Sequence, residues 1–151
     1  MSVLHDFPDL PPVWMLGHAV AAWALSDLAP LWRFAGAVPQ TLGAVLVVGG
    51  ASLAVWASVW FWRKRTTIEP REEPRALIVE GPFRINRNPI YTGMALMLLG
   101  WALWLGALSA VLVVLPFAWI IGRRFVAGEE AALREAFGAE AERYIGATRR
   151  W

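Results

Sequence analysis

The stretch GPFRINRNPIY, residues 81–91, is the part of this chain around which the other segments are arranged. It is polar, basic and rich in turn-forming residues, and an apolar run follows it directly from Met94. Because proline is tolerated in the first turn of a helix, Pro89 predicts the start of a membrane-spanning helix. Asn88 precedes a proline and is therefore disfavoured in helical conformation, so we expect the backbone before Pro89 to be available to a ligand.

On both sides of this stretch the composition is that of a membrane protein. The chain is 58% hydrophobic and 17% charged, whereas soluble domains are roughly 45–50% apolar and about 25% charged. No charged residue occurs from Pro39 to Phe61 or from Pro89 to Gly122. Runs of this length are typical of membrane spans. The sequence therefore predicts an all-α integral membrane protein that forms a single domain, residues 1–151.

About four transmembrane helices are expected, and the last two form a short helical hairpin that turns at Gly106. Each hairpin limb is short for a span, and Pro116 is expected to kink the second limb and free a carbonyl. The predicted helices are Val13–Leu31, Thr41–Trp62, Pro89–Leu105 and Ala107–Ile121.

The chain divides by composition into consecutive segments of one domain. Residues 1–65 carry the first two spans after an interfacial lead-in at 1–12, residues 66–88 are a connector, and residues 89–122 are the hairpin. Residues 123–151 are expected to form a C-terminal helix that extends from Glu129 to Arg150 and that Gly138 divides. Tyr144 and Trp151 are expected to anchor this helix at the membrane surface.

Basic residues predict the orientation in the membrane. Arg63-Lys64-Arg65 directly follows the second span, and Lys and Arg are retained on the cytoplasmic side. Both termini and the 81–91 stretch are therefore expected in the cytoplasm, with Arg33 a mild exception outside. The expected location is the bacterial inner membrane.

For several residues inside the spans, the sequence favours a structural role over a functional one. Gly50, Ala54 and Ser58 recur every four residues and form a small-residue face. Packing within the chain is favoured for this face, while a homodimer is left open. We expect His18 to be a packed, hydrogen-bonded histidine, and Asp27 to lie at headgroup level at a helix end.

Several kinds of chemistry are excluded. The chain has no cysteine, which rules out disulfides, thiolate catalysis and cysteine metal sites. His5 and His18 are the only histidines and lie far from the polar centre, so no metal site is predicted. Motifs for Rossmann and P-loop folds are absent. The pI near 9.7 reflects arginines beside apolar runs, which suit anionic lipid headgroups better than nucleic acid.

Three separated motifs carry a resemblance to a known superfamily. The 81–91 stretch is followed by the apolar hairpin, and then by Glu129-Glu130, Leu133, Phe137-Gly138 and Tyr144. This order resembles the integral-membrane methyltransferases, which include isoprenylcysteine carboxyl methyltransferase and the phospholipid N-methyltransferases. The resemblance covers roughly residues 66–150, and the first half matches only as membrane helices. Asn88 stands where eukaryotic members have histidine; it can hydrogen-bond but cannot titrate.

The resemblance implies a cofactor, an acceptor and site residues. The cofactor would be S-adenosylmethionine, and the acceptor a lipophilic or lipid-linked molecule with a carboxylate, amine or thiol. Glu129 or Glu130 would bind the cofactor amine or ribose, and Arg124 would lie near the acceptor. Tyr91, Glu129 and Arg124 are the catalytic candidates. The residues expected around the cofactor are Ala76, Leu77, Ile78, Phe83, Arg87, Asn88, Pro89, Ile90, Tyr91, Glu129 and Glu130.

Two other functions remain as alternatives. One is a non-catalytic membrane scaffold or lipid-binding protein with the same fold, and the other is a reductase with a nicotinamide cofactor. A protein of this fold that had lost its catalytic activity would have no reason to keep both the Arg87–Tyr91 stretch and the Glu129-Glu130 pair. The presence of both therefore favours the methyltransferase. A chain of 151 residues leaves little room for a nicotinamide site.

Overall fold

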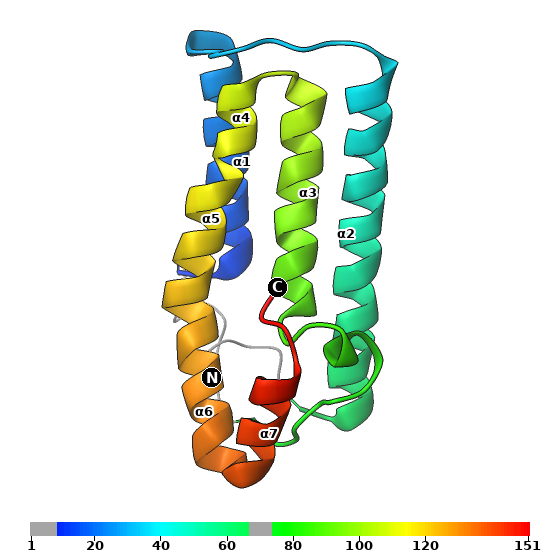
Figure 1. Cartoon of the computed structure of the whole chain (residues 1–151), viewed down its shortest axis with the longest axis vertical. Coiled ribbons are helices and arrows are strands. Elements are labelled where there is room, and N and C mark those ends of the chain that lie inside the picture. The colour runs from blue at the N-terminus through cyan, green and yellow to red at the C-terminus, as the bar shows by residue number, and fades with distance from the viewer. Residues whose placement is uncertain (1–8, 67–73) are drawn as a thin grey trace.

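The computed structural model describes residues 9–66 and 74–151, and all regular elements within them are helical. Three helices, α1, α2 and α3, stand side by side with a longer rod in which α4, α5, a π-helical turn η3 and α6 follow one another (Figure 1). The short helix α7 folds back beside α6. The all-α prediction is therefore confirmed. The bounds are α1 Pro11–Leu28, α2 Ala37–Lys64, the 3₁₀ turn η2 Gly81–Arg84, α3 Pro89–Leu105, α4 Leu108–Leu112, α5 Val114–Ile121, η3 Gly122–Val126, α6 Ala127–Phe137 and α7 Ala139–Ala147.

Two of these elements are long and apolar enough to cross a membrane. Among the described residues they are α2, with 28 residues, and the rod Leu108–Phe137, with 30 residues. The helix α3 is apolar but has 17 residues, and α1 has 18 residues that include polar side chains. At about 1.5 Å per residue, α2 rises about 42 Å. Four helical rods are present in the described residues, while the number that cross a bilayer stays a prediction.

Most predicted bounds agree with the structure, and those of the fourth helix and of the C-terminal helix do not. The helix α3 begins and ends where it was predicted, and α1 and α2 differ from prediction by a few residues at their ends. The prediction that the fourth helix ends at Ile121 is wrong, because the rod continues without a break to Phe137. Gly122 keeps helical angles, φ −60° and ψ −40°, and so does not terminate the helix. The charged residues that follow it extend the same rod beyond the apolar part.

The predicted lead-in and connector are described in part. Residues 1–8 of the lead-in and residues 67–73 of the connector lie outside the described residues. Within the rest of the connector, η2 is the regular element. Its glycine, Gly81, has φ +57°, and a Cβ there would lie 2.0 Å from Trp60 Nε1. A side chain at this position is therefore excluded both by backbone conformation and by the close approach of Trp60.

Glycines bring the backbones of α2 and α3 into contact. A Cβ on Gly50 would lie 2.5 Å from the carbonyl oxygen of Gly93, and one on Gly43 would lie 2.6 Å from that of Gly100. Without a hydrophobic force between helices in lipid, small residues allow the close packing that holds them together. Ala54 also contacts this position, since its Cβ would lie 3.2 Å from a Cβ on Gly93. The predicted packing of Gly50 and Ala54 within the chain is confirmed, and a homodimer stays a prediction.

Two loops tie the helices together at the end of the bundle that we call the turn end. There the link between α1 and α2, residues 29–36, passes over the tight turn between α3 and α4 (Figure 1). Phe34 N donates to Gly106 O at 2.9 Å, and Leu108 N donates to Trp32 O at 2.8 Å. Gly106 has φ +69°, which a glycine adopts without strain. The hairpin predicted at Gly106 is therefore confirmed.

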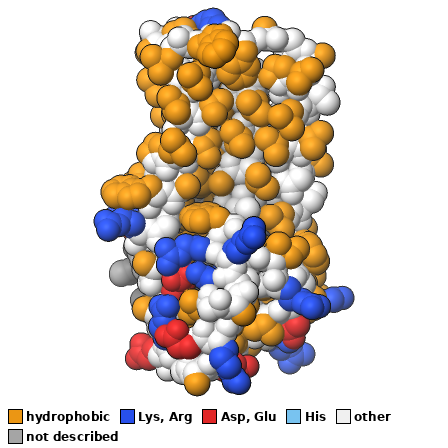
Figure 2. Space-filling model, viewed as in Figure 1, with side chains coloured by type: hydrophobic (Ala, Val, Ile, Leu, Met, Phe, Trp, Pro, Cys, Tyr) orange, Lys and Arg blue, Asp and Glu red, His pale blue; other side chains and the backbone are white. Residues whose placement is uncertain are grey.

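Charged side chains gather at the opposite end, which we call the charged end. In Figure 2, apolar side chains cover the half of the molecule near the turn end, and most Lys, Arg, Asp and Glu side chains lie at the other end. The charged end contains the C-terminus of α2, η2, α6 and α7. Large apolar side chains point outward from α2, among them Val48, Val55 and Trp62. This surface suits a lipid environment, as the charge-free sequence runs predict.

Individual residues inside the helices agree with the sequence-based interpretation. His18 Nδ1 lies 2.7 Å from Trp14 O, and its ring packs edge-on against Phe117 with centroids 5.4 Å apart. Asp27 is exposed and is the penultimate residue of α1. The rod is interrupted at Val113, one turn before Pro116, where the missing proline N–H weakens the helix. The packed histidine and the position of Asp27 at a helix end are thus confirmed, whereas the kink with its freed carbonyl and the headgroup level of Asp27 stay predictions.

Candidate functional site

A cavity of about 600 Å³ lies at the charged end, within the range of small-molecule sites. It is bounded by the start of α1, the connector, the first turn of α3, α6 and α7. All the site residues predicted from the sequence line this cavity: Ala76, Leu77, Ile78, Phe83, Arg87, Asn88, Pro89, Ile90, Tyr91, Arg124, Glu129 and Glu130. The structure thus brings together three motifs that are far apart in the sequence, and their roles stay predictions.

Tyr91 and Glu129 form a hydrogen-bonded pair in the cavity wall. The Tyr91 hydroxyl donates to Glu129 Oε1, and Tyr91 is 7% exposed. Tyr91 stands in the first turn of α3, and Glu129 stands near the start of α6. The rod from α4 to α6 returns antiparallel to α3 and so carries Glu129 back to Tyr91 (Figure 1). The Tyr91 ring also packs near Phe125, with centroids 6.4 Å apart.

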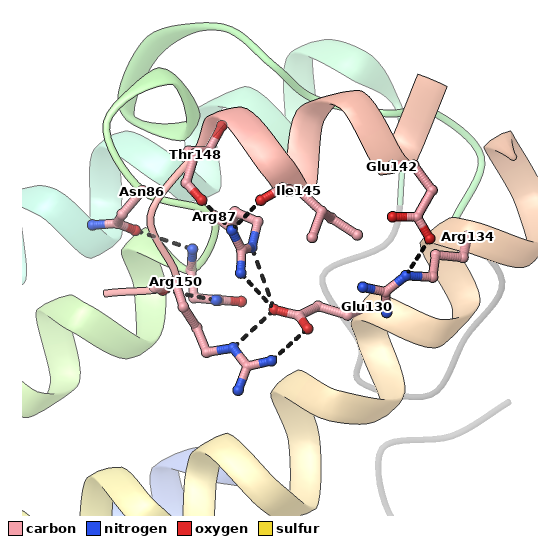
Figure 3. Close-up of polar contacts among 9 residues, drawn as sticks. Asn86, Arg87, Glu130, Arg134, Glu142, Ile145, Thr148 and Arg150 are labelled. Atoms are coloured by element: carbon pink, nitrogen blue, oxygen red, sulfur yellow. Dashed lines mark hydrogen bonds and ion pairs between the residues drawn. The ribbon is translucent and has the colours of Figure 1, made fainter. Parts of the chain in front are cut away.

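The neighbouring carboxylate, Glu130, is held by two arginines (Figure 3). Arg87 Nη2 lies 3.0 Å from Glu130 Oε1, and Arg150 donates from Nε to Oε1 at 2.9 Å and from Nη2 to Oε2 at 2.6 Å. The side chain of Glu130 is 6% exposed. The hydrogen bond to Glu130 raises the pKa of Arg150 above its usual value. Both oxygens of Glu130 therefore have protein partners, and its charge is compensated within the chain.

Arg87 is engaged with the C-terminal part of the chain. Besides Glu130, its guanidinium contacts the carbonyl oxygens of Ile145, through Nη1 at 2.7 Å, and Thr148. Arg87 Nε also donates to Glu130 Oε1 at 3.3 Å, so four of the five N–H groups of this arginine have partners. The geometry favours a structural role for Arg87 and for Glu130, although both line the cavity.

The backbone before Pro89 is already hydrogen-bonded within the protein. Arg87 N donates to Arg149 O at 2.8 Å, and Asn88 N donates to Asn86 Oδ1 at 3.0 Å. The expectation that this backbone is available to a ligand is therefore wrong for both amides. For Arg87 the cause is Arg149 near the C-terminus, and for Asn88 it is the side chain of Asn86. The Asn88 side chain is used in the same way, since its Nδ2 donates to Arg150 O at 2.9 Å.

One wall of the cavity is apolar and is closed by Tyr144. Ile78 and Phe83 are each 6% exposed and pack with Ala57. The Tyr144 hydroxyl donates to Phe83 O at 2.9 Å, and burial raises the pKa of Tyr144 to about 12. This hydrogen bond satisfies a carbonyl of η2 and ties α7 to the connector. That Tyr144 anchors the tail at the membrane surface stays a prediction.

Arg124 lies at the rim of the cavity, beside the start of α1. Its Nε donates to Asp9 Oδ1 at 2.5 Å, and Trp14 Nε1 donates to the same oxygen at 3.0 Å. The guanidinium carbon also lies 5.7 Å from the centre of the Trp14 ring. Arg124 belongs to η3, and π-helical turns occur frequently at functional sites. Sequence reasoning placed Arg124 near the acceptor but did not identify Asp9 as its partner.

The C-terminal residues are the main part of the site that sequence reasoning missed. Gly138 divides the tail as predicted, with φ +50°, but α7 ends at Ala147 and not at Arg150. Thr148 has extended angles, φ −120° and ψ 143°. A β-branched threonine shortly after Gly146 is a weak helix-ending signal. Nothing local in the sequence, however, indicates that these residues pair with residues 86–88.

A comparison with known proteins finds a matching family model and a similar protein. A family model described as phospholipid methyltransferase matches residues 38–140, which include most of α2, all of α3 and the whole rod. An uncharacterized protein of Haemophilus influenzae is 42% identical over 62 residues, which are 41% of this chain and 98% of that protein. No solved structure matches the chain.

Proposed function

Because this chain belongs to the phospholipid methyltransferase family, we propose that it transfers a methyl group from S-adenosylmethionine to a lipophilic or lipid-linked acceptor. The family and the two long apolar helices indicate a methyltransferase of the membrane. The cofactor, the acceptor and the orientation are the proposed part. The observation that carries the proposal is the cavity at the charged end, which gathers every site residue predicted from three separated motifs.

The side chains around the cavity fit the chemistry of this cofactor. Ala76, Leu77, Ile78 and Phe83 form an apolar wall that suits an adenine ring. Glu129 is an acceptor-only group when ionised and suits the ammonium or the ribose hydroxyls. When bound, S-adenosylmethionine supplies an activated methyl group on a sulfonium. We assign structural roles to Glu130 and Arg87, because they form an ion pair and Arg87 also donates to the carbonyl oxygens of Ile145 and Thr148.

Of the two neighbouring glutamates, we assign Glu129 to the ligand, and Tyr91 orients its carboxylate. Its hydroxyl proton lies in the hydrogen bond to Glu129 Oε1, so this bond defines the direction of the carboxylate. The buried Tyr91 ring and Phe83 also give the cavity an aromatic wall, which favours a site with little water. Exclusion of water strengthens electrostatic interactions inside a site. If the acceptor is an amine, Glu129 is the group placed to accept its proton.

The membrane side of the cavity supports a lipid-borne acceptor. Leu10, Pro11, Pro12 and Met94 line the same cavity as Arg124. An apolar acceptor could pass along these residues while Arg124 stays near its polar group. This arrangement favours an acceptor with an apolar tail over a fully water-soluble one. A lipid extract incubated with the protein and radiolabelled S-adenosylmethionine is expected to yield label in the organic phase.

In the proposed orientation, four rods span the bacterial inner membrane and the charged end lies in the cytoplasm. Outward-facing Leu16, Val20 and Trp23 on α1 support its contact with lipid. Retention of Lys and Arg on the cytoplasmic side supports the orientation. Because the chain has no cysteine, a single cysteine introduced by substitution can be labelled selectively at its thiol. In intact cells, Arg33→Cys is expected to react with a membrane-impermeant maleimide and Arg65→Cys is not; the reverse pattern would contradict the orientation.

Titration of detergent-purified protein with S-adenosylhomocysteine tests the cofactor. Wild type is expected to bind saturably, and Glu129→Gln is expected to weaken binding about tenfold, because charge-assisted hydrogen bonds contribute about 1.5–3 kcal/mol. Arg143→Ala, a change of an exposed side chain on α7, serves as the control. Absence of saturable binding in a folded wild-type protein would refute the proposal and favour the non-catalytic scaffold.

A further inference from the structure

The last four residues, Thr148–Trp151, leave α7 and return along the stretch that precedes α3 (Figure 3). We call these residues the C-terminal strap. Arg149 pairs with Asn86 in a parallel bridge, and Trp151 lies beside Gly122, 3.7 Å from a Cβ built on that glycine. The strap therefore extends from the end of α7 to the π-helical turn of the rod. Its course runs past the cavity residues Arg87 and Asn88.

On one side, the strap is bound to the residues that lead into α3. Its backbone oxygens accept hydrogen bonds from Arg87 N at 2.8 Å and from Asn88 Nδ2 at 2.9 Å. The Arg87 guanidinium also donates to Thr148 O. These bonds hold the segment directly before Tyr91, which stands in the first turn of α3.

On its other side, the strap is bound to α6. Arg150 makes two hydrogen bonds to Glu130, and Arg87 reaches the same carboxylate (Figure 3). Adjacent residues on a helix point about 100° apart. Holding Glu130 therefore sets the rotation of α6, and with it the direction in which Glu129 points. The strap thus joins the two elements that carry Tyr91 and Glu129.

We propose that the C-terminal strap is a positioning device for the cofactor site, and that Arg150 acts through Glu130 to hold Glu129 against Tyr91. This inference rests on the proposed function, because it assigns the Tyr91–Glu129 pair to the cofactor. Arg150 is a positioning residue and does not itself contact the cofactor. The side chain of Arg150 is 44% exposed, whereas that of Arg87 is 10% exposed. Replacement of Arg150 therefore keeps the buried Arg87 contact to Oε1, which preserves the fold, but removes the bonds from Arg150 to both oxygens, so that Arg87 alone no longer fixes the direction of the carboxylate.

Binding of S-adenosylhomocysteine to the full chain provides the first test. Arg150→Ala is expected to raise its Kd about tenfold, because small misplacements of binding groups are costly. Arg150→Lys should restore part of the affinity, and Arg143→Ala should bind like wild type. In a Tyr91→Phe background, Arg150→Ala should have little further effect, because the pair that it positions is already broken. Equal affinities for Arg150→Ala and Arg143→Ala, or additive effects of Arg150→Ala and Tyr91→Phe, would overturn the proposal.

The mobility of a spin label tests the strap contacts independently of the proposed function. Because the chain has no cysteine, Arg149→Cys can carry a single nitroxide on an exposed position of the strap. The label is expected to be immobilised in the wild-type background and mobile with Arg150→Ala. A label that is equally mobile in both backgrounds would contradict the proposal that Arg150 holds the strap in place. A wild-type protein that fails to bind S-adenosylhomocysteine while the label is immobilised would instead refute the proposed function.

Discussion

The apolar half and the charged end of this molecule hold their helices together by different means. Between α2 and α3, glycines allow backbone contact, and this packing needs no directional group. At the charged end, α3, α6 and the C-terminal strap are joined by Arg87, Glu130 and Arg150 through ion pairs and hydrogen bonds. The first arrangement is sensitive to volume and the second to charge. Substitutions that add volume in the apolar half and substitutions that remove charge at the charged end should therefore lower stability to different extents.

Loss of the central arginine should be the most damaging change. Arg87→Ala leaves Glu130 with Arg150 alone and removes a donor from two C-terminal carbonyls. Removal of one partner from a buried ion pair costs about 3–5 kcal/mol. We expect this loss in the free energy of unfolding, measured in detergent. Arg84→Ala, in the same stretch but exposed, is the control; an equal loss there would show that charge at this end, and not the Arg87 contacts, is responsible.

A single methyl group between α2 and α3 should have the next largest effect. In Gly50→Ala, the new Cβ would lie 2.5 Å from Gly93 O, so the helices must separate. Overpacking of this kind costs about 1–3 kcal/mol. Gly49→Ala is a matched control on the neighbouring residue, since a Cβ there meets nothing within 4 Å. Thermal unfolding should distinguish the two variants, and identical melting temperatures would contradict the close packing.

Removal of the Tyr91 hydroxyl should act on binding more than on stability. Tyr91→Phe keeps the buried ring and deletes the hydrogen bond to Glu129. We expect a five- to tenfold rise in the Kd of S-adenosylhomocysteine, in keeping with about 1–1.5 kcal/mol for one hydrogen bond. Isothermal titration checks the affinity. If affinity is unchanged while stability falls, Tyr91 serves only to pack the helices.

The ion pair between Lys64 and Glu80 should contribute least. Their side chains are 35% and 41% exposed, and exposed pairs contribute about 0.2–1 kcal/mol. The hydrogen bond from Lys64 lowers the pKa of Glu80. This contribution is therefore present above the unfolded-state pKa and is lost as pH falls through the lower folded-state pKa. Unfolding measured from neutral to acidic pH should show a small loss in wild type that is missing in Lys64→Ala; high salt should reduce it too.

Much of the candidate site could be predicted because it depends on residue types in a set order. The charge-free runs predicted which segments are apolar helices, and the hairpin at Gly106 predicted that α6 would return to Tyr91. The continuation of the rod past Gly122 was missed because glycine beside two arginines resembles a helix end. The strap was missed because its bonds join residues 61 positions apart, as for Arg87 and Thr148, or 20 positions apart, as for Arg150 and Glu130, and no local pattern encodes such pairs.

The amino-acid sequence by itself determined the helical membrane architecture and the set of residues at the charged end. Apolar runs and their polar boundaries are properties of composition, and they act through the transfer of side chains between water and lipid. Only the tertiary structure decided which charged groups satisfy one another and which remain for a ligand. Glu129 and Glu130 are chemically identical neighbours, yet the rotation of α6 directs one to Tyr91 and the other to Arg87 and Arg150.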